Sequence, residues 1–149
     1  MNCQNFRVDT LLTEQTHKLS PYCQAINLRI GNDQQDKRLY HLPFAKQNIG
    51  NIFLLRLHGG LLGGFLQSCI QLYLSEQAAQ SEPPYLINFA IDYLRGGKAQ
   101  DSYAQCQILH SGRRISQVTV TMWQEDPEKP IAIARGHLQM ANDDQPDII

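Results

Sequence analysis

The sequence lacks any apolar segment that could direct the chain into or across a membrane. Its first stretch, MNCQNFRVDTLLTEQ, carries acidic residues and no apolar core, so we expect no secretory signal peptide. The longest apolar run, at 61–74, is too short to span a bilayer and is interrupted by Gln67, Ser68 and Gln71. We therefore expect a protein that works outside membranes.

An excess of either charge is also missing. The sequence holds 13 Lys and Arg against 14 Asp and Glu, which gives a formal net charge of −1, and the cations are scattered along the chain. A nucleic-acid partner would require a basic face. The composition therefore argues against nucleic-acid binding.

Motifs for metal and nucleophile chemistry are absent as well. The four cysteines, Cys3, Cys23, Cys69 and Cys106, lie far apart without a CxxC pair, which argues against a structural zinc site. The sequence contains no GxSxG motif and no cluster of metal ligands. Free thiols are typical of a reducing compartment, so we expect a cytoplasmic protein with no bound metal. Cys69 lies within an apolar stripe and is expected to be a buried core thiol.

The chain length suits a single domain over residues 1–149. A short helix is predicted at 5–18, with Pro21 as its stop signal. Two strands are predicted next, at 25–30 and 39–44, around a polar turn.

A long helix is predicted from about residue 60 to residue 80. Its apolar residues recur every three or four positions, which predicts a broad buried stripe, and Pro83 and Pro84 end it. Everything after the prolines reads as strands, at 85–94, 103–109, 115–124 and 131–140. One long helix followed by a strand meander predicts an α+β fold, with the helix packed on an antiparallel sheet.

Several short motifs lie along this pattern in a fixed order. They are Ile49-Gly50-Asn51, His58-Gly59-Gly60, NFAIDYLR at 88–95, SGRRIS at 111–116 and AIARGHLQM at 132–140. In this order and spacing they resemble the hotdog-fold thioesterases of the phenylacetate-degradation type, over roughly residues 22–140. The resemblance implies a long central helix wrapped by a curved antiparallel sheet, dimers or tetramers, and hydrolysis of acyl-CoA thioesters. CoA is then part of the substrate, and no separate cofactor is implied.

The glycines that open the long helix fit such chemistry. Water attack puts negative charge on the thioester oxygen, and free N–H groups at a helix N-terminus can stabilise that charge. Gly59 and Gly60 are therefore candidates for an oxyanion site, and the resemblance assigns the donor to Gly59. Gly63 and Gly64 would leave room for an acyl chain or a partner helix. The alternative is that all four glycines only permit close helix packing.

Gln67 is the departure from the family pattern. The resemblance places a catalytic Asp or Glu nine residues after His58, and this sequence has Gln67 there. An amide cannot accept a proton at neutral pH, although it can hydrogen-bond a water or the thioester. Two functions compete: a thioesterase that is slow or mechanistically altered, and a non-catalytic acyl-CoA or acyl-carrier binding protein. Glu76 is too far along the helix to substitute, and Asp92 is more often a structural partner of nearby backbone.

Four further residues have two interpretations each. Asn51 could hold a water or cap a turn, and His58 could contact substrate or brace its loop. Arg113 and Arg114 could bind the CoA phosphates, or they could be solvated charges of a hairpin. The sequence leaves these alternatives open.

Overall fold

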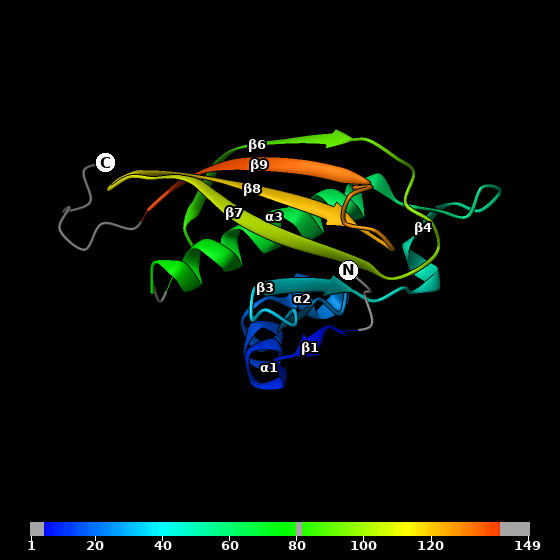
Figure 1. The fold of residues 1–149 in the computed structure, drawn as a ribbon, viewed down its shortest axis with the longest axis horizontal. Coiled ribbons are helices and arrows are strands. Elements are labelled where there is room, and N and C mark those ends of the chain that lie inside the picture. Colours follow the sequence, from blue (N-terminus) through cyan, green and yellow to red (C-terminus); the bar gives the residue numbers. More distant parts are fainter. Residues whose placement is uncertain (1–4, 80–81, 141–149) are drawn as a thin grey trace.

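The computed structural model describes residues 5–79 and 82–140, which form one large antiparallel sheet around a long helix (Figure 1). The strand order in the sheet is β1-β2-β3-β7-β8-β9-β6, and β4 and β5 form a separate hairpin. The strands are β1 (Arg7–Val8), β2 (Arg29–Asn32), β3 (Arg38–Leu42), β4 (Ile49–Asn51), β5 (Arg56–Leu57), β6 (Tyr85–Tyr93), β7 (Ser102–Ser111), β8 (Ile115–Trp123) and β9 (Ala132–Gln139). The helices are α1 (Thr10–Leu19), α2 (Pro21–Ala25), α3 (Gly59–Gln77) and a 3-10 turn at Lys46–Asn48.

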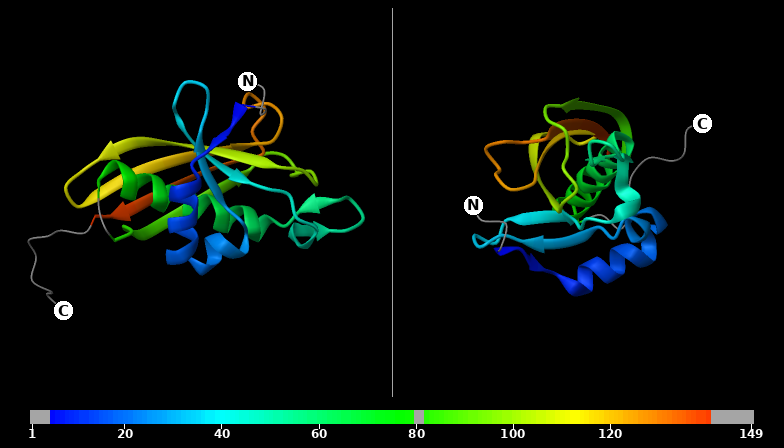
Figure 2. Two further views of the ribbon diagram at one scale, coloured as in Figure 1. Left: turned by 90° about the horizontal axis from the view of Figure 1, so that it is seen from below. Right: turned by 90° about the vertical axis from the view of Figure 1, so that its right-hand side faces the viewer.

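Helix α3 is the centre of the core. Seen end-on, it is surrounded by strands: β6–β9 arch over one side and β2 and β3 cross the other (Figure 2). Its buried apolar stripe is Leu62, Phe65, Leu66, Cys69, Ile70 and Leu74. These side chains pack with inward residues of the sheet such as Val118 and Val120. The predicted α+β arrangement, with a long helix against a curved antiparallel sheet, is confirmed.

The N-terminal segment differs from its prediction. The helix expected at 5–18 is shorter, since the chain first forms β1 and α1 begins only at Thr10, after the N-cap Asp9. Pro21 does not only stop this helix; it occupies the first turn of α2, where its missing N–H costs nothing. The strand predicted at 25–30 therefore begins later, at Arg29. Helices α1 and α2 cover the outer side of β2 and β3 (Figure 2).

The strands after α3 match their predictions, with one local exception. Strict two-residue alternation would place Ile87, Phe89 and Ile91 on one face of β6, but the register against β9 shifts between Leu86 and Asn88. This bulge turns Ile87 outward, where it is 50% exposed, and turns Leu86 onto the core instead. The β4–β5 hairpin was not predicted.

A buried histidine joins β3 to the segment before β7. The His41 side chain is 4% exposed, and its Nε2 lies 2.9 Å from Oδ2 of Asp101. The ring stacks on Tyr103, with centroids 4.8 Å apart, and Oδ1 of Asp101 accepts the Phe44 N–H at 2.8 Å. Burial lowers the pKa of His41 despite the neighbouring carboxylate. Burial acts to raise the pKa of Asp101, but the hydrogen bonds from Phe44 and His41 lower it overall.

This pair predicts that the fold weakens in acid. His41 binds its proton less readily in the folded chain than at its ordinary pKa of 6.5, so the free energy of unfolding falls as pH drops below that value. The lowered pKa of Asp101 adds a further loss below about 3.8. Urea unfolding at fixed protein concentration, from pH 7.5 to 5, should show the first loss. The His41→Phe variant keeps a ring on Tyr103 and should show a smaller slope, and an equal slope would exclude His41 as its source.

Candidate active site

The histidine before α3 is the N-cap of that helix. Nδ1 of His58 accepts the Gly60 N–H at 3.0 Å, and the His58 N–H donates to the Asn48 carbonyl at 2.9 Å. The Gly60 donor is therefore occupied within the chain, and the ring braces the loop. A Cβ at Gly60 would come within 3.0 Å of Cε1 of His58. The structure thus accounts for His58 and Gly60 as a capping unit at the entrance to the helix.

The Gly59 N–H, by contrast, is open. It lies at the positive end of a 19-residue helix, and within the described ranges no hydrogen bond occupies it. The Gly59 carbonyl accepts the Tyr93 hydroxyl at 2.7 Å, which ties the first turn of α3 to the end of β6. A small cleft of about 290 Å³ opens beside this turn, and its lining includes Arg56, Leu62 and Tyr93. A hydrogen-bond donor that stabilises developing negative charge has to be unoccupied and next to a space that the substrate can enter, as the Gly59 N–H is.

The other glycines of α3 serve different neighbours. A Cβ at Gly63 would lie 3.7 Å from the Tyr93 hydroxyl oxygen, which is an ordinary contact. A Cβ at Gly64 would overlap the Tyr22 hydroxyl, because the Tyr22 ring of α2 packs directly on this turn. The space expected at Gly64 for an acyl chain or a partner helix is therefore filled by the chain itself. At this position the close-packing interpretation applies.

Gln67 lies one helical turn beyond Gly63, on the same face of α3. It is half-buried, and its amide forms no hydrogen bond within the part of the chain that the structure describes. Its polar neighbours are engaged, since Ser68 donates to the Gly64 carbonyl at 2.9 Å and Gln71 donates to the Pro84 carbonyl at 3.3 Å. The Gln67 amide therefore remains available to a ligand or a water.

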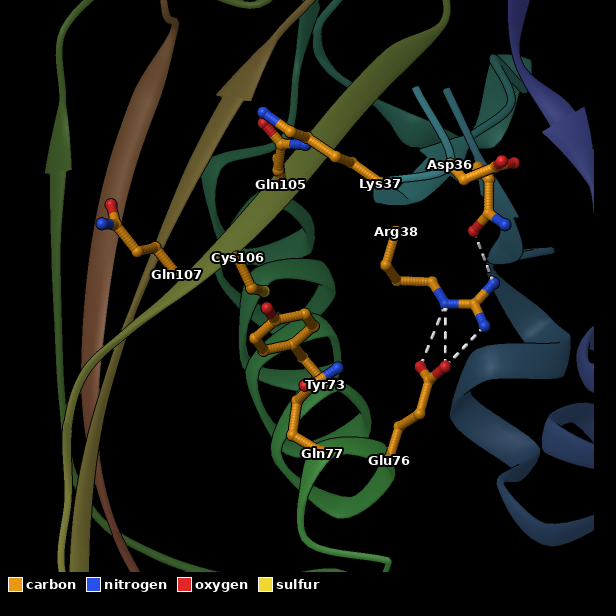
Figure 3. Close-up of a pocket in the computed structure, with 10 residues that line it drawn as sticks. Asp36, Lys37, Arg38, Tyr73, Glu76, Gln77, Gln105, Cys106 and Gln107 are labelled. Carbon is orange, nitrogen blue, oxygen red and sulfur yellow. Dashed lines mark hydrogen bonds and ion pairs between the residues drawn. The ribbon is translucent and has the colours of Figure 1, made fainter. Parts of the chain in front are cut away.

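Neither alternative acid lies near Gly59. Asp92 is exposed and, by strand alternation, points to the face of β6 opposite Tyr93. Glu76 lies seventeen residues after Gly59, about 25 Å along the helix. Its carboxylate is held by the Arg38 guanidinium, with Nε of Arg38 3.0 Å from Oε2 (Figure 3).

A larger cleft lies at this other end of α3. It has a volume of about 630 Å³ and lies where β3 separates from β7, with Tyr73, Cys106 and Gln77 around it (Figure 3). Two cations, Lys37 and Arg38, line this cleft, and Arg38 is already bonded to Glu76 and to Oδ1 of Asn32. The Arg38 guanidinium is therefore less available to a thioester than the open N–H of Gly59.

The structure does not bring the other predicted residues to Gly59 in the same way. Oδ1 of Asn51 accepts the N–H groups of Phe53 and Leu54, both at 3.0 Å, which is the turn-capping interpretation. Arg113 and Arg114 are exposed at the β7–β8 turn, at the opposite end of the sheet. Seven residues of β8 separate that end from the position aligned with Tyr93, which is about 24 Å. Their contact with CoA stays a prediction.

Thiol and metal chemistry have no support at this site. Cys69 is fully buried, and burial raises the pKa of its thiol well above the ordinary value. Cys23, Cys69 and Cys106 are free thiols, and Cys3 lies outside the described residues. Across 5–79 and 82–140 no group of three or more His, Cys, Asp or Glu could hold a metal ion. In the same ranges no helix is long and apolar enough to cross a membrane.

Two features of the site were missed at the sequence level. Tyr93 lies in the DYLR motif, but only the folded register brings its hydroxyl to Gly59. Arg56 and Arg95 line the cleft beside Gly59, although they are distant in sequence. Neither feature has a periodicity or spacing signal.

Comparison with known proteins identifies the class of protein to which this fold and this glycine-opened helix belong. The model of the acyl-CoA thioesterase N-terminal domain matches residues 53–139. A Chromobacterium violaceum protein of known structure is 32% identical to this chain and superposes on it with a TM-score of 0.74. The match covers 91% of this chain and 94% of that protein's chain. The chain therefore belongs to the acyl-CoA thioesterase family of the hotdog-fold thioesterase superfamily.

More distant structures share the fold. A Bacillus halodurans protein crystallised with CoA is 14% identical, with 89% of this chain and 87% of that one covered and a TM-score of 0.73. The Escherichia coli PaaI protein of the phenylacetic acid degradation operon is 18% identical, with 87% and 90% covered and a TM-score of 0.71. No curated protein matches the chain. The superfamily assignment from sequence is confirmed, whereas the phenylacetate-degradation type stays a prediction.

Proposed function

We propose that the chain binds the thioester of an acyl-CoA at the N-terminus of α3 and hydrolyses it slowly. The observation that carries this proposal is the unoccupied N–H of Gly59, a residue that lines a cleft at the positive end of α3. The thioester oxygen would accept this N–H, and it would do so more strongly as negative charge develops. The CoA-bound Bacillus halodurans structure, which has the same fold, supports CoA as the carrier.

The remaining site residues take supporting roles in this proposal. His58 and Gly60 hold the first turn in place, and Asn51 holds the preceding hairpin or orients a water. Gln67 of the same chain lies eight residues after Gly59, about 12 Å along α3. The Gln67 that reaches the attacking water therefore comes from the partner protomer of a homodimer, and it hydrogen-bonds this water but cannot take its proton. Loss of a general base typically costs about 10²–10⁴ in rate, so we expect turnover well below that of a thioesterase with a carboxylate here.

The Gln67 amide also favours a second candidate function. A site that keeps the oxyanion donor but lacks the base would suit an acyl-CoA or acyl-carrier binding protein. A hydrolysis screen over short, medium, long and aromatic acyl-CoAs, run beside a calorimetric binding titration, separates the two. Turnover supports the enzyme, and tight binding without turnover supports the binder. Neither binding nor turnover across the panel would overturn both.

We further propose that the chain is a single cytoplasmic domain that forms a homodimer or a homotetramer. Strand β6 is an edge of the sheet, and an open edge that carries apolar side chains invites pairing with another chain. The exposed apolar residues on and beside this edge are Tyr85, Ile87, Tyr93 and Leu94. Pairing of two β6 edges would bring a partner close to Gln67 and complete the cleft.

Sedimentation velocity at micromolar concentration should therefore show a dimer or larger species. The variant Ile87→Lys places a charge at the proposed edge and should shift the population toward monomer. The matched control is Leu19→Lys on α1, because Leu19 is 85% exposed and lies on the other side of the molecule. A wild-type monomer, or equal behaviour of the two variants, would count against pairing through β6.

A further inference from the structure

The cleft beside Gly59 adjoins a second cleft. This second cleft has a volume of about 310 Å³ and shares Arg56, Arg95 and Gly96 with the first. It extends away from α3 to the β8–β9 turn, where Lys129 lines it. The two adjacent clefts are together called the groove, which extends from Gly59 to the turn that joins β8 and β9.

The floor of this groove is held firmly in place. The Leu57 N–H donates to the Gly97 carbonyl at 2.9 Å, and Gln124 both accepts the Lys98 N–H and donates to the Lys98 carbonyl, each at 2.9 Å. A Cβ at Gly96 would lie 3.0 Å from Nε of Arg56, so the Arg56 side chain lies across this glycine. The cations at this floor, Arg56 and Lys98, therefore lie on backbone that is fixed by hydrogen bonds.

Cations outnumber acids in the second cleft. Arg56, Arg95, Lys98 and Lys129 line it, against the acids Glu125 and Asp126. Arg95 donates to the Pro130 carbonyl at 2.7 Å, Glu125 accepts from Gln100, and Asp126 accepts the Glu128 N–H. Within the described residues, Arg56, Lys98 and Lys129 form no ion pair. These three side chains are free to meet an anion.

We propose that this basic end of the groove binds the phosphates of the CoA nucleotide. The inference rests on the proposed function, because it takes the thioester to be at Gly59. Phosphate is the anion for which Arg and Lys side chains are best suited, and the flexible pantetheine arm would lie along the shared part of the groove. The carrier is then CoA itself, and Lys98 and Lys129 determine that preference. The sequence-based alternative, Arg113 and Arg114, lies at the far end of the sheet.

The test compares an acyl-CoA with the same acyl group on pantetheine, which lacks the nucleotide. The variant Lys98→Gln/Lys129→Gln should lose at least ~10-fold of the affinity advantage that acyl-CoA has over acyl-pantetheine in the wild type. In the wild type, the acyl ester of 3′-dephospho-CoA should bind with an affinity between those of acyl-CoA and acyl-pantetheine. The control Lys18→Gln/Lys37→Gln removes the same charge from exposed positions outside the groove, with Lys37 at the separate cleft near Arg38 and Glu76, and should keep that advantage. The single variant Lys129→Gln is measured as well, and thermal melting checks that it is folded, so that its loss of affinity can be assigned to the charge and not to a disturbed loop.

Each outcome distinguishes the nucleotide site from the thioester site. If acyl-CoA binds wild type but Lys98→Gln/Lys129→Gln matches the control, the nucleotide assignment is overturned while the proposed function stands. If Arg113→Gln/Arg114→Gln carries the loss instead, the phosphates lie at the hairpin. If the wild type binds an acyl-carrier protein but no CoA ester, the proposal that CoA carries the acyl group is overturned. If no thioester binds in any form, the proposed function itself fails.

Discussion

Replacement of Gln67 by glutamate should raise acyl-CoA hydrolysis at least ~10-fold, because a general base commonly contributes ~100-fold or more. The two side chains are nearly equal in size, and the Gln67 amide has no hydrogen bond to lose within the described chain. The new carboxylate would lie on the helix face that carries Gly63, where it could take a proton from a bound water. Hydrolysis is measured over the acyl-CoA panel from pH 6 to 9. The range is needed because burial would raise the pKa of the new glutamate.

The matched control for this variant is Gln71→Glu. It makes the same chemical change one turn further along α3, where the native amide is bonded to the Pro84 carbonyl. We expect no gain there. A flat response of Gln67→Glu over the whole range of pH and acyl group, or an equal gain in Gln71→Glu, would contradict the idea that the site lacks only its base. Brisk wild-type turnover would point to a different catalytic group, and Asp92→Asn would be the next variant.

Replacement of Gly59 by valine should weaken acyl-CoA binding by at least ~10-fold. A Cβ at this position would touch the Tyr93 hydroxyl at 3.5 Å, and the two valine methyls would extend into the cleft over the N–H. The backbone of Gly59 is not left-handed, and valine suits a helix better than glycine, so the fold should persist. Calorimetry gives the affinity, and circular dichroism checks the fold.

The neighbouring variant Gly60→Ala sharpens this prediction. Its Cβ would meet only the end of the His58 ring, which can move, and the Gly60 N–H is already taken by that ring. We therefore expect a smaller loss than in Gly59→Val. The reverse order, or unchanged affinity in Gly59→Val with a native spectrum, would exclude Gly59 as the thioester donor.

The sequence predicts the elements that carry strong local signals. The three- and four-residue spacing from Leu62 to Leu74 and the break at Pro83 define α3, and two-residue alternation between glycine and proline turns defines β6–β9. The bulge that turns Ile87 outward has no such signal, because it depends on pairing with β9. The β4–β5 hairpin was missed for a related reason. Its tip, from Ile52 to Leu55, is apolar yet exposed, with Phe53 91% exposed, so it shows neither alternation nor polarity.

The site also has some features that the sequence predicts and others that only the fold assembles. A short motif marks the helix N-terminus, and the nine-residue spacing from His58 marks the departure at Gln67, because these positions belong to one helix and the residue that caps it. The contacts of Tyr22 with Gly64 and of Tyr93 with Gly59 join separate elements, and only the fold brings them together. The basic groove is assembled from the residues before α3, after β6 and after β8. No single stretch of sequence contains that pattern.

The most direct measurement is a crystal structure of the protein with a ketone analogue of acyl-CoA, in which a methylene replaces the thioester sulfur. The account predicts that the ketone oxygen lies about 2.7–3.1 Å from the Gly59 nitrogen of one protomer, with the Gln67 amide of its partner facing the same carbonyl or its water. An analogue bound instead at the cleft near Arg38 and Glu76, with the Gly59 N–H uncontacted, would contradict it.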